Sequence, residues 1–335
     1  MIVQLQENIL ANDLQTICEH IQSIDYQTSR VKTQRGDYIV AIGKKEFDIR
    51  KIGGLNGVKD IHRVSDTYKL VSKKWKVDST YIDLGDGVTI GNELTIIAGP
   101  CSIEGEEQVR KTIDHLRQHN VRIMRGGVFK PRTSPYSFQG MGLDGLKMWS
   151  QIARENNIKI ISEILAVDQI EKMHEYVDIF QVGARNSQNF TLLHELGKVD
   201  KPVMLKRGIS GTLDELLHSA EYIFSNGNER LILCERGIRT FEKAYRNTLD
   251  LNAVPILKEK SHLPVIVDPS HGIGVRRFVK DMALAGLAAG ANGVIIEIHE
   301  QPQKAISDAQ QTIDFRNSTV LIEQLHKMHA LLKSF

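Results

Sequence analysis

From residue 94 onward, short apolar runs alternate with amphipathic segments along the chain. The runs are rich in Ile and Val, as expected for parallel strands buried on both faces. They are residues 94–98, 121–124, 158–162, 178–182, 203–206, 230–234, 264–267 and 293–298. Between them, apolar residues recur at helical spacing, for example in 106–119, 143–156, 213–225 and 278–289. Eight such repeats predict an α/β fold, a (β/α)8 TIM barrel, rather than a doubly wound sheet, whose dinucleotide-binding glycine fingerprint is missing.

Residues 1–66 show a different pattern, which predicts a small, separate α+β domain before the barrel. Strand-like runs at 2–5, 28–33, 38–42 and 58–64 and helical segments at 11–24 and 47–52 follow one another in the order βαββαβ. This is the order of a ferredoxin-like sandwich. The domain is expected either to serve packing or oligomerisation, or to sense a small molecule and cover the catalytic mouth.

Residues 67–92 are expected to link these two parts. Four lysines surround Trp75, which favours a solvated linker. Strand-like runs at 81–84 and 88–90 flank the turn signal Gly85-Asp86-Gly87 and predict a short hairpin. Such a hairpin could plug the barrel end away from the active site, and residues 93–335 would form the catalytic barrel.

Composition restricts the partners of this chain. Its 335 residues are 41% hydrophobic and 25% charged, as in an ordinary soluble globular protein. Basic and acidic residues nearly cancel to a net charge of +2, which argues against a nucleic-acid or membrane surface. Three cysteines, with no visible export signal or transmembrane run, predict a reduced, cytoplasmic protein.

Ionisable side chains gather where the predicted strands end. In (β/α)8 barrels the chemistry lies at the carboxyl ends of the strands. The eight strand ends supply, in chain order, Cys101, Arg125, Glu163, Arg185, Lys206, Glu235 with Arg236, Asp268 with His271, and Glu297 with His299. Any one of these could be a surface charge or a core cysteine, but all eight together predict an active site at this face.

The stretch 122–140 holds the densest group of candidate anion ligands. Gly126 and Gly127 interrupt a buried strand and let the backbone approach a ligand closely. The loop that follows, stiffened by two prolines, holds four further candidates, Lys130, Arg132, Thr133 and Ser134. Guanidinium and ammonium groups on such a loop suit carboxylate and phosphate oxygens.

Two chemical subsets emerge from these positions. One is cationic and would suit phosphorylated substrates: Arg125, Lys130, Arg132, Arg185, Lys206 and Arg236. The other combines a thiolate, an imidazole and two carboxylates that could surround one divalent ion: Cys101, His271, Glu297 and Asp308. This donor mixture selects no single metal, so Mn²⁺, Fe²⁺, Co²⁺ and Zn²⁺ all remain acceptable. Cys234, inside a strand, is expected in the core.

The motifs that carry these residues resemble those of 3-deoxy-D-arabino-heptulosonate-7-phosphate (DAHP) synthase. They are AGPCS (98–102), RGGVFKPRTSPYSFQG (125–140), QVGARNSQNF (181–190), LKRG (205–208), ILCERGIRTFE (232–242), VDPSHG (267–272) and GVIIEIHEQPQKAISDAQQ (293–311). The resemblance covers 67–335 strongly and 1–66 by pattern only. It is to the short microbial subclass, in which a ferredoxin-like domain precedes the barrel.

The resemblance implies a role for each matching residue. One divalent ion would be bound by Cys101, His271, Glu297 and Asp308. Phosphoenolpyruvate would be bound by Arg125, Lys130, Arg185, Lys206 and Arg236, with Glu163 beside it. D-erythrose 4-phosphate would be bound by Arg132, Thr133 and Ser134. Lys130 and Glu163 are the candidates for handling the proton of the reacting water, whereas Cys101 and His271 would act in catalysis through the metal.

The implied reaction is an aldol-like condensation that opens the shikimate pathway to the aromatic amino acids. Carbon three of phosphoenolpyruvate attacks the aldehyde of erythrose 4-phosphate, water adds at carbon two, and phosphate leaves. The resemblance further implies a homotetramer and feedback inhibition by tyrosine or phenylalanine through residues 1–66.

Three other interpretations remain open on the sequence. The sister enzyme that makes 3-deoxy-D-manno-octulosonate 8-phosphate from arabinose 5-phosphate shares the barrel and phosphoenolpyruvate, but the loop 130–134 resembles the four-carbon sugar version. A non-catalytic anion-binding scaffold should have lost a metal ligand or a cation. A Schiff-base aldolase would use Lys206 as the nucleophile and would not respond to a chelator.

Overall fold

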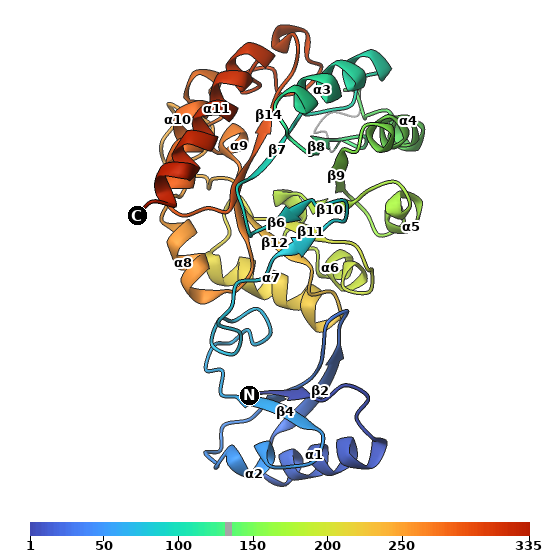
Figure 1. Ribbon diagram of the computed structural model, residues 1–335, viewed down its shortest axis with the longest axis vertical. Coiled ribbons are helices and arrows are strands. Elements are labelled where there is room, and N and C mark those ends of the chain that lie inside the picture. The colour runs from blue at the N-terminus through green and yellow to red at the C-terminus, as the bar shows by residue number, and fades with distance from the viewer. Residues whose placement is uncertain (131–135) are drawn as a thin grey trace.

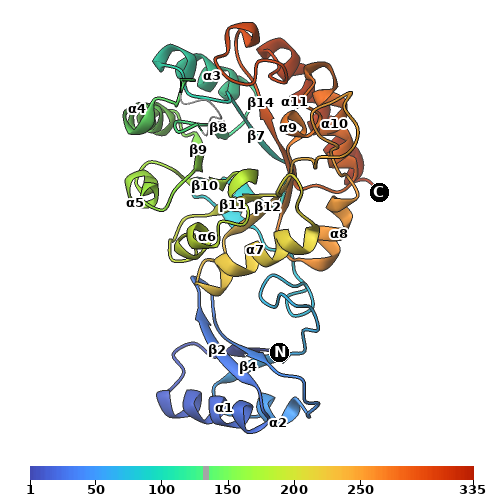
Figure 2. The same ribbon diagram turned by 180° about the vertical axis from the view of Figure 1, so that it is seen from behind.

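The computed structural model describes residues 1–130 and 136–335. A barrel and a small sheet domain lie end to end, with an irregular connector between them (Figures 1 and 2). None of the helices in the described part of the chain is both long and apolar enough to cross a membrane. The predicted Arg132, Thr133 and Ser134 lie outside the described residues.

The barrel consists of eight parallel strands that close in the order β10-β11-β12-β13-β14-β7-β8-β9. The strands are β7 (Thr95–Gly99), β8 (Ile123–Gly126), β9 (Lys159–Ile164), β10 (Ile179–Val182), β11 (Val203–Lys206), β12 (Leu231–Glu235), β13 (Val265–Val267) and β14 (Gly293–Glu297). Each begins within two residues of its predicted start, so the predicted (β/α)8 barrel is confirmed.

Helices cover the outside of the barrel. They are α3 (Glu106–Gln118), α4 (Gly142–Glu155), α5 (Gln169–His174), α6 (Phe190–Leu196), α7 (Leu213–Ser225), α8 (Ala253–Lys260), α10 (Arg276–Ala288) and α11 (Phe315–Leu332). The short helix α9 (Pro269–Ile273) directly follows β13 at the carboxyl ends of the strands. Their apolar faces pack on the strands; α7, for instance, buries Leu216, Ala220 and Ile223. Its start is fixed by a capping box between Thr212 and Glu215, which satisfies two backbone amides of the first turn.

The inside of the barrel is a packed apolar layer to which every strand contributes. Because side chains alternate in direction along a strand, each strand directs an apolar side chain into the barrel. These are Ile97, Ile123, Ile161, Ile179, Met204, Ile232, Ile266 and Ile295. Ile82, Val88 and Ile90 of the hairpin β5 (Ile82–Asp83) and β6 (Thr89–Ile90) join the same layer. The barrel is thus filled at its amino end, which leaves the carboxyl end for chemistry.

The N-terminal sheet has the strand order β2-β3-β1-β4, and all its neighbouring strands are antiparallel. Its elements are β1 (Ile2–Leu5), α1 (Ala11–Ser23), β2 (Gln27–Lys32), β3 (Asp37–Ile42), α2 (Arg50–Gly53) and β4 (Val58–His62). Ile17 and Ile21 of α1 are fully buried against one face of the sheet. This order and pairing are those of the predicted ferredoxin-like sandwich.

The connector is packed rather than solvated, so the prediction of a solvated linker is wrong for its central part. Leu70, Val71 and Trp75 are buried. The backbone amides of residues 69–71 donate to the Glu221 carboxylate on α7, with N···O distances of 2.9–3.0 Å. The lysine pattern misled because lysine stems can cover apolar surface while their charged heads reach solvent.

The N-terminal domain contacts the amino-terminal side of its own barrel. Thr33 Oγ1 donates to Glu229 Oε1 at 3.1 Å, just before β12 begins, and Tyr38 makes an edge contact with Phe224 of α7. Both contacts lie at the barrel end opposite the strand termini that carry the predicted chemistry. The expectation that this domain covers the catalytic mouth is therefore wrong for the mouth of the same chain.

Candidate active site

A cavity of about 260 Å³ opens at the carboxyl ends of the strands. Eight predicted site residues line it: Arg125, Lys130, Glu163, Arg185, Lys206, Arg236, His271 and Asp308. They come from β8, β9, β11 and from the segments that follow β8, β10, β12, β13 and β14. The barrel closure thus brings together side chains that are far apart in the sequence. Gly99 allows part of this closeness, because a Cβ there would lie 2.1 Å from the Arg125 carbonyl oxygen.

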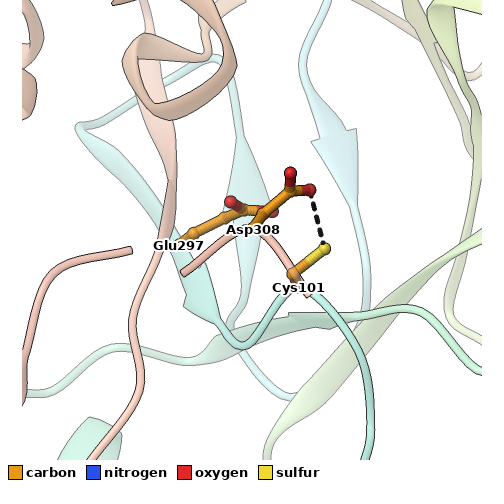
Figure 3. A group of neighbouring side chains, drawn as sticks. All are labelled: Cys101, Glu297 and Asp308. Carbon is orange, nitrogen blue, oxygen red and sulfur yellow. Dashed lines mark hydrogen bonds between the residues drawn. The ribbon is translucent and has the colours of Figure 1, made fainter. Parts of the chain in front are cut away.

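Three of the four predicted metal ligands form one compact group, Cys101, Glu297 and Asp308 (Figure 3). Their possible ligand atoms all lie within 4.8 Å of one another, and Cys101 Sγ lies 3.1 Å from Asp308 Oδ2. The fourth residue, His271, directs Nε2 toward the same group, at 3.4 Å from Glu297 Oε1 and 3.9 Å from Asp308 Oδ2. A thiol, an imidazole and two carboxylates that converge in this way fit a single divalent ion.

The charges of the site keep its carboxylates ionised. Burial opposes ionisation of Asp308, but His271, the Cys101 hydrogen bond and Arg246 outweigh it and lower the pKa to about 2. The pKa of Glu297 is likewise lowered, since His271 and Arg125 outweigh its complete burial. Burial raises the pKa of the Cys101 thiol. Asp308 also holds a left-handed backbone conformation, φ 52°, which Asp tolerates better than most L residues.

Two of the predicted cations, Arg125 and Lys130, contact the metal-ligand group directly. Arg125 pairs with Glu297 through Nη1, and its buried Nε has no hydrogen-bond partner within residues 1–130 and 136–335. Lys130 Nζ lies 3.1 Å from Cys101 Sγ and 3.0 Å from the Cys101 carbonyl oxygen. Burial lowers the pKa of Arg236, whose guanidinium donates to the neighbouring Gly237 carbonyl. An anionic ligand would therefore compensate cations that are held largely out of water.

Lys206 and His271 meet at one buried carboxylate, Asp268, which directly follows β13. Asp268 Oδ2 lies 2.6 Å from Lys206 Nζ and 2.7 Å from His271 Nδ1. These neighbours hold the pKa of Asp268 well below its usual range despite complete burial. The sequence showed Asp268 only as one of several polar strand ends and gave it no role.

Other strand-end residues serve the framework instead of the cavity. Glu235 is fully buried and pairs with Arg207 at 2.9 Å. His299 faces Glu104, with 3.5 Å between Nε2 and Oε2. Cys234 belongs to the apolar layer inside the barrel, as predicted.

Sequence reasoning missed several residues of the site. Arg239, Arg246 and Asn247 line the cavity from the segment after β12. Gln311 donates to Glu297 Oε2 at 2.7 Å and accepts from Arg246 at 2.7 Å. Arg239, Arg246 and Asn247 could have been identified from their position after a barrel strand. The contacts of Gln311 have no signal in the sequence.

Comparisons with known proteins identify the family of this chain. The DAHP synthetase I family matches residues 74–334. The phospho-2-dehydro-3-deoxyheptonate aldolase of Thermotoga maritima is 46% identical over 330 residues, which cover 98% of this chain and 97% of the relative. The 2-dehydro-3-deoxyphosphooctonate aldolase of Syntrophobacter fumaroxidans is 31% identical over 267 residues, or 74% of this chain and 91% of the relative.

Solved structures give the same picture. The crystal structure of DAHP synthase from Thermotoga maritima superimposes with a TM-score of 0.79 at 45% identity and covers 99% of this chain and 97% of that chain. A truncated form of the Thermotoga enzyme gives a TM-score of 0.75 at 46% identity, covering 80% and 98%. With a family match over the whole barrel and a relative of this identity over nearly the full length, the chain belongs to the DAHP synthetase I family.

Proposed function

We propose that this chain catalyses the metal-dependent condensation of phosphoenolpyruvate with D-erythrose 4-phosphate and water, giving DAHP and phosphate. The observation that carries the proposal is one cavity in which cationic side chains adjoin the Cys101, Glu297 and Asp308 group. The name of the Thermotoga relative supports it. The reaction would be the first step of the shikimate pathway.

Phosphoenolpyruvate carries a phosphate and a carboxylate, and the cavity offers cations for both. Arg125, Lys130, Arg185, Lys206 and Arg236 all line it. Arg125 Nε has no partner among the described residues and Arg236 is buried, which supports a ligand with several anionic oxygens. Lys206 is paired with Asp268, as suits a phosphate-binding cation better than the free amine of a Schiff-base aldolase.

In the proposed reaction a carbon–carbon bond forms between carbon three of phosphoenolpyruvate and the aldehyde carbon of the sugar. The aldehyde oxygen gains a proton, and hydroxide from water adds at carbon two. The bond from carbon two to the phosphate oxygen then breaks, phosphate leaves, and the new hydroxyl gives up its proton as carbon two becomes a ketone. A divalent ion at Cys101, His271, Glu297 and Asp308 would polarise the aldehyde oxygen as a Lewis acid. Lys130 and Glu163, which both line the cavity, are proposed to move the water-derived proton.

The choice of sugar is the finer part of the proposal. The residues predicted to bind the sugar, Arg132, Thr133 and Ser134, lie outside the described segments. The assignment of erythrose 4-phosphate therefore depends on the sequence motif. The second candidate is condensation with arabinose 5-phosphate, because the 2-dehydro-3-deoxyphosphooctonate aldolases match the barrel at about 30% identity. The higher identity to the Thermotoga heptonate aldolase over nearly the full chain favours the four-carbon sugar.

The test measures phosphate release from phosphoenolpyruvate with each sugar in turn, after EDTA treatment and after addition of Mn²⁺. Turnover is expected with erythrose 4-phosphate alone, lost in EDTA and restored by metal. Turnover with arabinose 5-phosphate would transfer the proposal to the sister reaction. Full activity in EDTA would remove the metal role of Cys101, His271, Glu297 and Asp308.

We further propose that residues 1–66 bind tyrosine or phenylalanine as a feedback inhibitor and that the chain forms a homotetramer in the cytoplasm. The separate core of this domain and the solved truncated form of the Thermotoga enzyme support an experiment with residues 67–335 alone. The truncated enzyme is expected to stay active and to lose inhibition. Equal inhibition of the truncated and full chains would contradict the proposal.

A further inference from the structure

Asp268 is held in place from three sides. Its backbone N–H donates to the Glu235 carbonyl of β12 at 2.8 Å, and its Oδ1 accepts the backbone N–H of His271 at 3.0 Å. Its side chain is 1% exposed. Its Oδ2 atom accepts hydrogen bonds from both Lys206 Nζ and His271 Nδ1. One oxygen atom therefore touches a residue of the phosphate-binding set and a residue of the metal-binding set.

This contact determines what the His271 ring can do. An ionised carboxylate can only accept hydrogen bonds, so Nδ1 carries the proton that it donates to Asp268. A ring that binds a metal ion through Nε2 keeps its lone pair on that atom and its proton on Nδ1, and Nε2 is the atom that faces Glu297 Oε1 and Asp308 Oδ2. Histidine ligands of metals are commonly oriented by a carboxylate in this way.

The same oxygen determines where Lys206 can point. Lys206 ends β11, is 4% exposed and lines the cavity. An ammonium group has three N–H donors. One is directed at Asp268, which leaves the others for oxygens of an anion in the cavity. A shift of Oδ2 would therefore displace both the ammonium group and the imidazole.

We propose that Asp268 is a positioning residue that couples binding of a divalent cation to binding of phosphoenolpyruvate through its shared Oδ2 atom. The inference rests on the proposed function, since both ligands come from it. A bound ion would fix the His271 ring, the ring would fix Oδ2, and Oδ2 would fix Lys206 for the phosphate. Because such coupling is reciprocal, each ligand strengthens the binding of the other by the same factor.

A second connection between the two ligand sets runs from Arg125 to Glu297. Direct attraction between a cation and an anion in one cavity adds to it. Both remain when Asp268 is changed, so the inference predicts a reduced coupling factor and not its disappearance. The coupling factor is the ratio of the phosphoenolpyruvate dissociation constants without and with Mn²⁺.

The test compares Asp268→Asn and Lys206→Met with the wild type in the full chain, using calorimetry for phosphoenolpyruvate and electron paramagnetic resonance for Mn²⁺. Asp268→Asn is expected to weaken Mn²⁺ binding by about 10- to 100-fold, as for other carboxylates that orient histidine ligands. Lys206→Met keeps the pair of Asp268 and His271, so its Mn²⁺ affinity in the absence of phosphoenolpyruvate should stay near the wild-type value. Both variants should lower the coupling factor by at least about fivefold, or about 1 kcal/mol.

Asp250→Asn is the matched control. Asp250 is another carboxylate at this end of the barrel, but its partner is Arg207 and not Lys206 or His271. It should keep the wild-type coupling factor. If Asp268→Asn does not fold, as judged by its melting curve, the coupling factor of Lys206→Met alone decides whether the inference holds.

The outcomes separate the two claims. A wild type that binds no Mn²⁺ or no phosphoenolpyruvate contradicts the proposed function, and this inference with it. A wild type that binds both ligands, together with variants that keep its coupling factor, overturns the inference alone.

Discussion

The two ends of the barrel bury very different groups. At the carboxyl end, Glu297, Asp268 and Lys206 are nearly inaccessible, yet all three are in ion pairs. At the amino end, the hairpin adds Ile82 and Ile90 to an apolar layer. Beyond that layer, the Leu70 carbonyl of the connector forms a hydrogen bond with His262, whose pKa is lowered by burial so that the ring stays uncharged.

The difference shows where the chain accepts the cost of burying charge. A buried ion pair stabilises a fold little, because both ions lose their hydration. Apolar side chains in place of such pairs would stabilise the fold equally well, as the apolar layer at the amino end illustrates. Their concentration around the cavity therefore points to ligand binding, whereas the amino end serves mainly to hold the barrel closed.

The largest expected effect comes from two buried cysteines, Cys101 in the metal-ligand group and Cys234 in the apolar cluster inside the barrel. Cys101→Ala removes the sulfur from the metal-ligand group and is expected to lower kcat about 1000-fold, or about 4 kcal/mol. Cys234→Ala leaves a small void in the apolar layer and should cost about 1–2 kcal/mol of unfolding free energy, with kcat within about twofold. Steady-state kinetics and urea unfolding of both variants test this. Activity losses that simply follow the stability losses would contradict a chemical role for Cys101.

The second effect concerns the connector. Glu221→Ala leaves the amides of Lys69, Leu70 and Val71 without their acceptor, and is expected to lower the unfolding free energy by about 2–4 kcal/mol. Glu221→Gln, which keeps one oxygen acceptor, should lose less. Activity per folded molecule should stay unchanged in both variants, because α7 contributes this residue on the side away from the cavity. A loss of kcat in folded Glu221→Ala would show that the connector also shapes the mouth.

The third effect distinguishes the two ends of the barrel by the pH at which each loses its contribution to stability. His262 bonds to Thr80 Oγ1 and the Leu70 carbonyl, and burial lowers its pKa to about 3. The unfolded chain binds the proton below about pH 6.5 and the folded chain does not, so stability falls as the pH falls. From pH 7.5 to 5 the loss is about 2 kcal/mol. Asp308, whose pKa is about 2, stays ionised over this range, so its contribution is lost only in stronger acid.

The measurement is urea unfolding followed by the fluorescence of Trp75, whose ring lies 5.7 Å from that of His262. Trp149→Phe in the background leaves Trp75 as the single tryptophan. His262→Gln should remove about 2 kcal/mol of the pH dependence. The other buried histidine with a lowered pKa, His115, is present in both chains and cancels in the comparison. An unchanged pH slope would mean that His262 is already charged in the folded chain.

The sequence was sufficient to predict the barrel, because two strong periodicities repeat eight times and strand ends must share one face. The same pattern also predicted that Cys101, His271, Glu297 and Asp308 form one group. The sequence could not show the packed connector, since Glu221 lies about 150 residues from the backbone amides that donate hydrogen bonds to it. Nor could it show that Lys206 and His271 share one oxygen of Asp268, because such contacts depend on side-chain direction and not on pattern.

The smallest expected effect is at the tip of the hairpin, where Asp86 pairs with Lys159 at 2.7 Å. The Asp86 side chain is 65% exposed, so water and salt screen the pair. Asp86→Asn keeps a residue that tolerates the left-handed φ of 53° and removes only the charge. Its melting temperature should change by less than about 2 °C. Because the apolar layer is inferred to hold the hairpin in place, a much larger decrease would show that the amino end, too, depends on a charged contact.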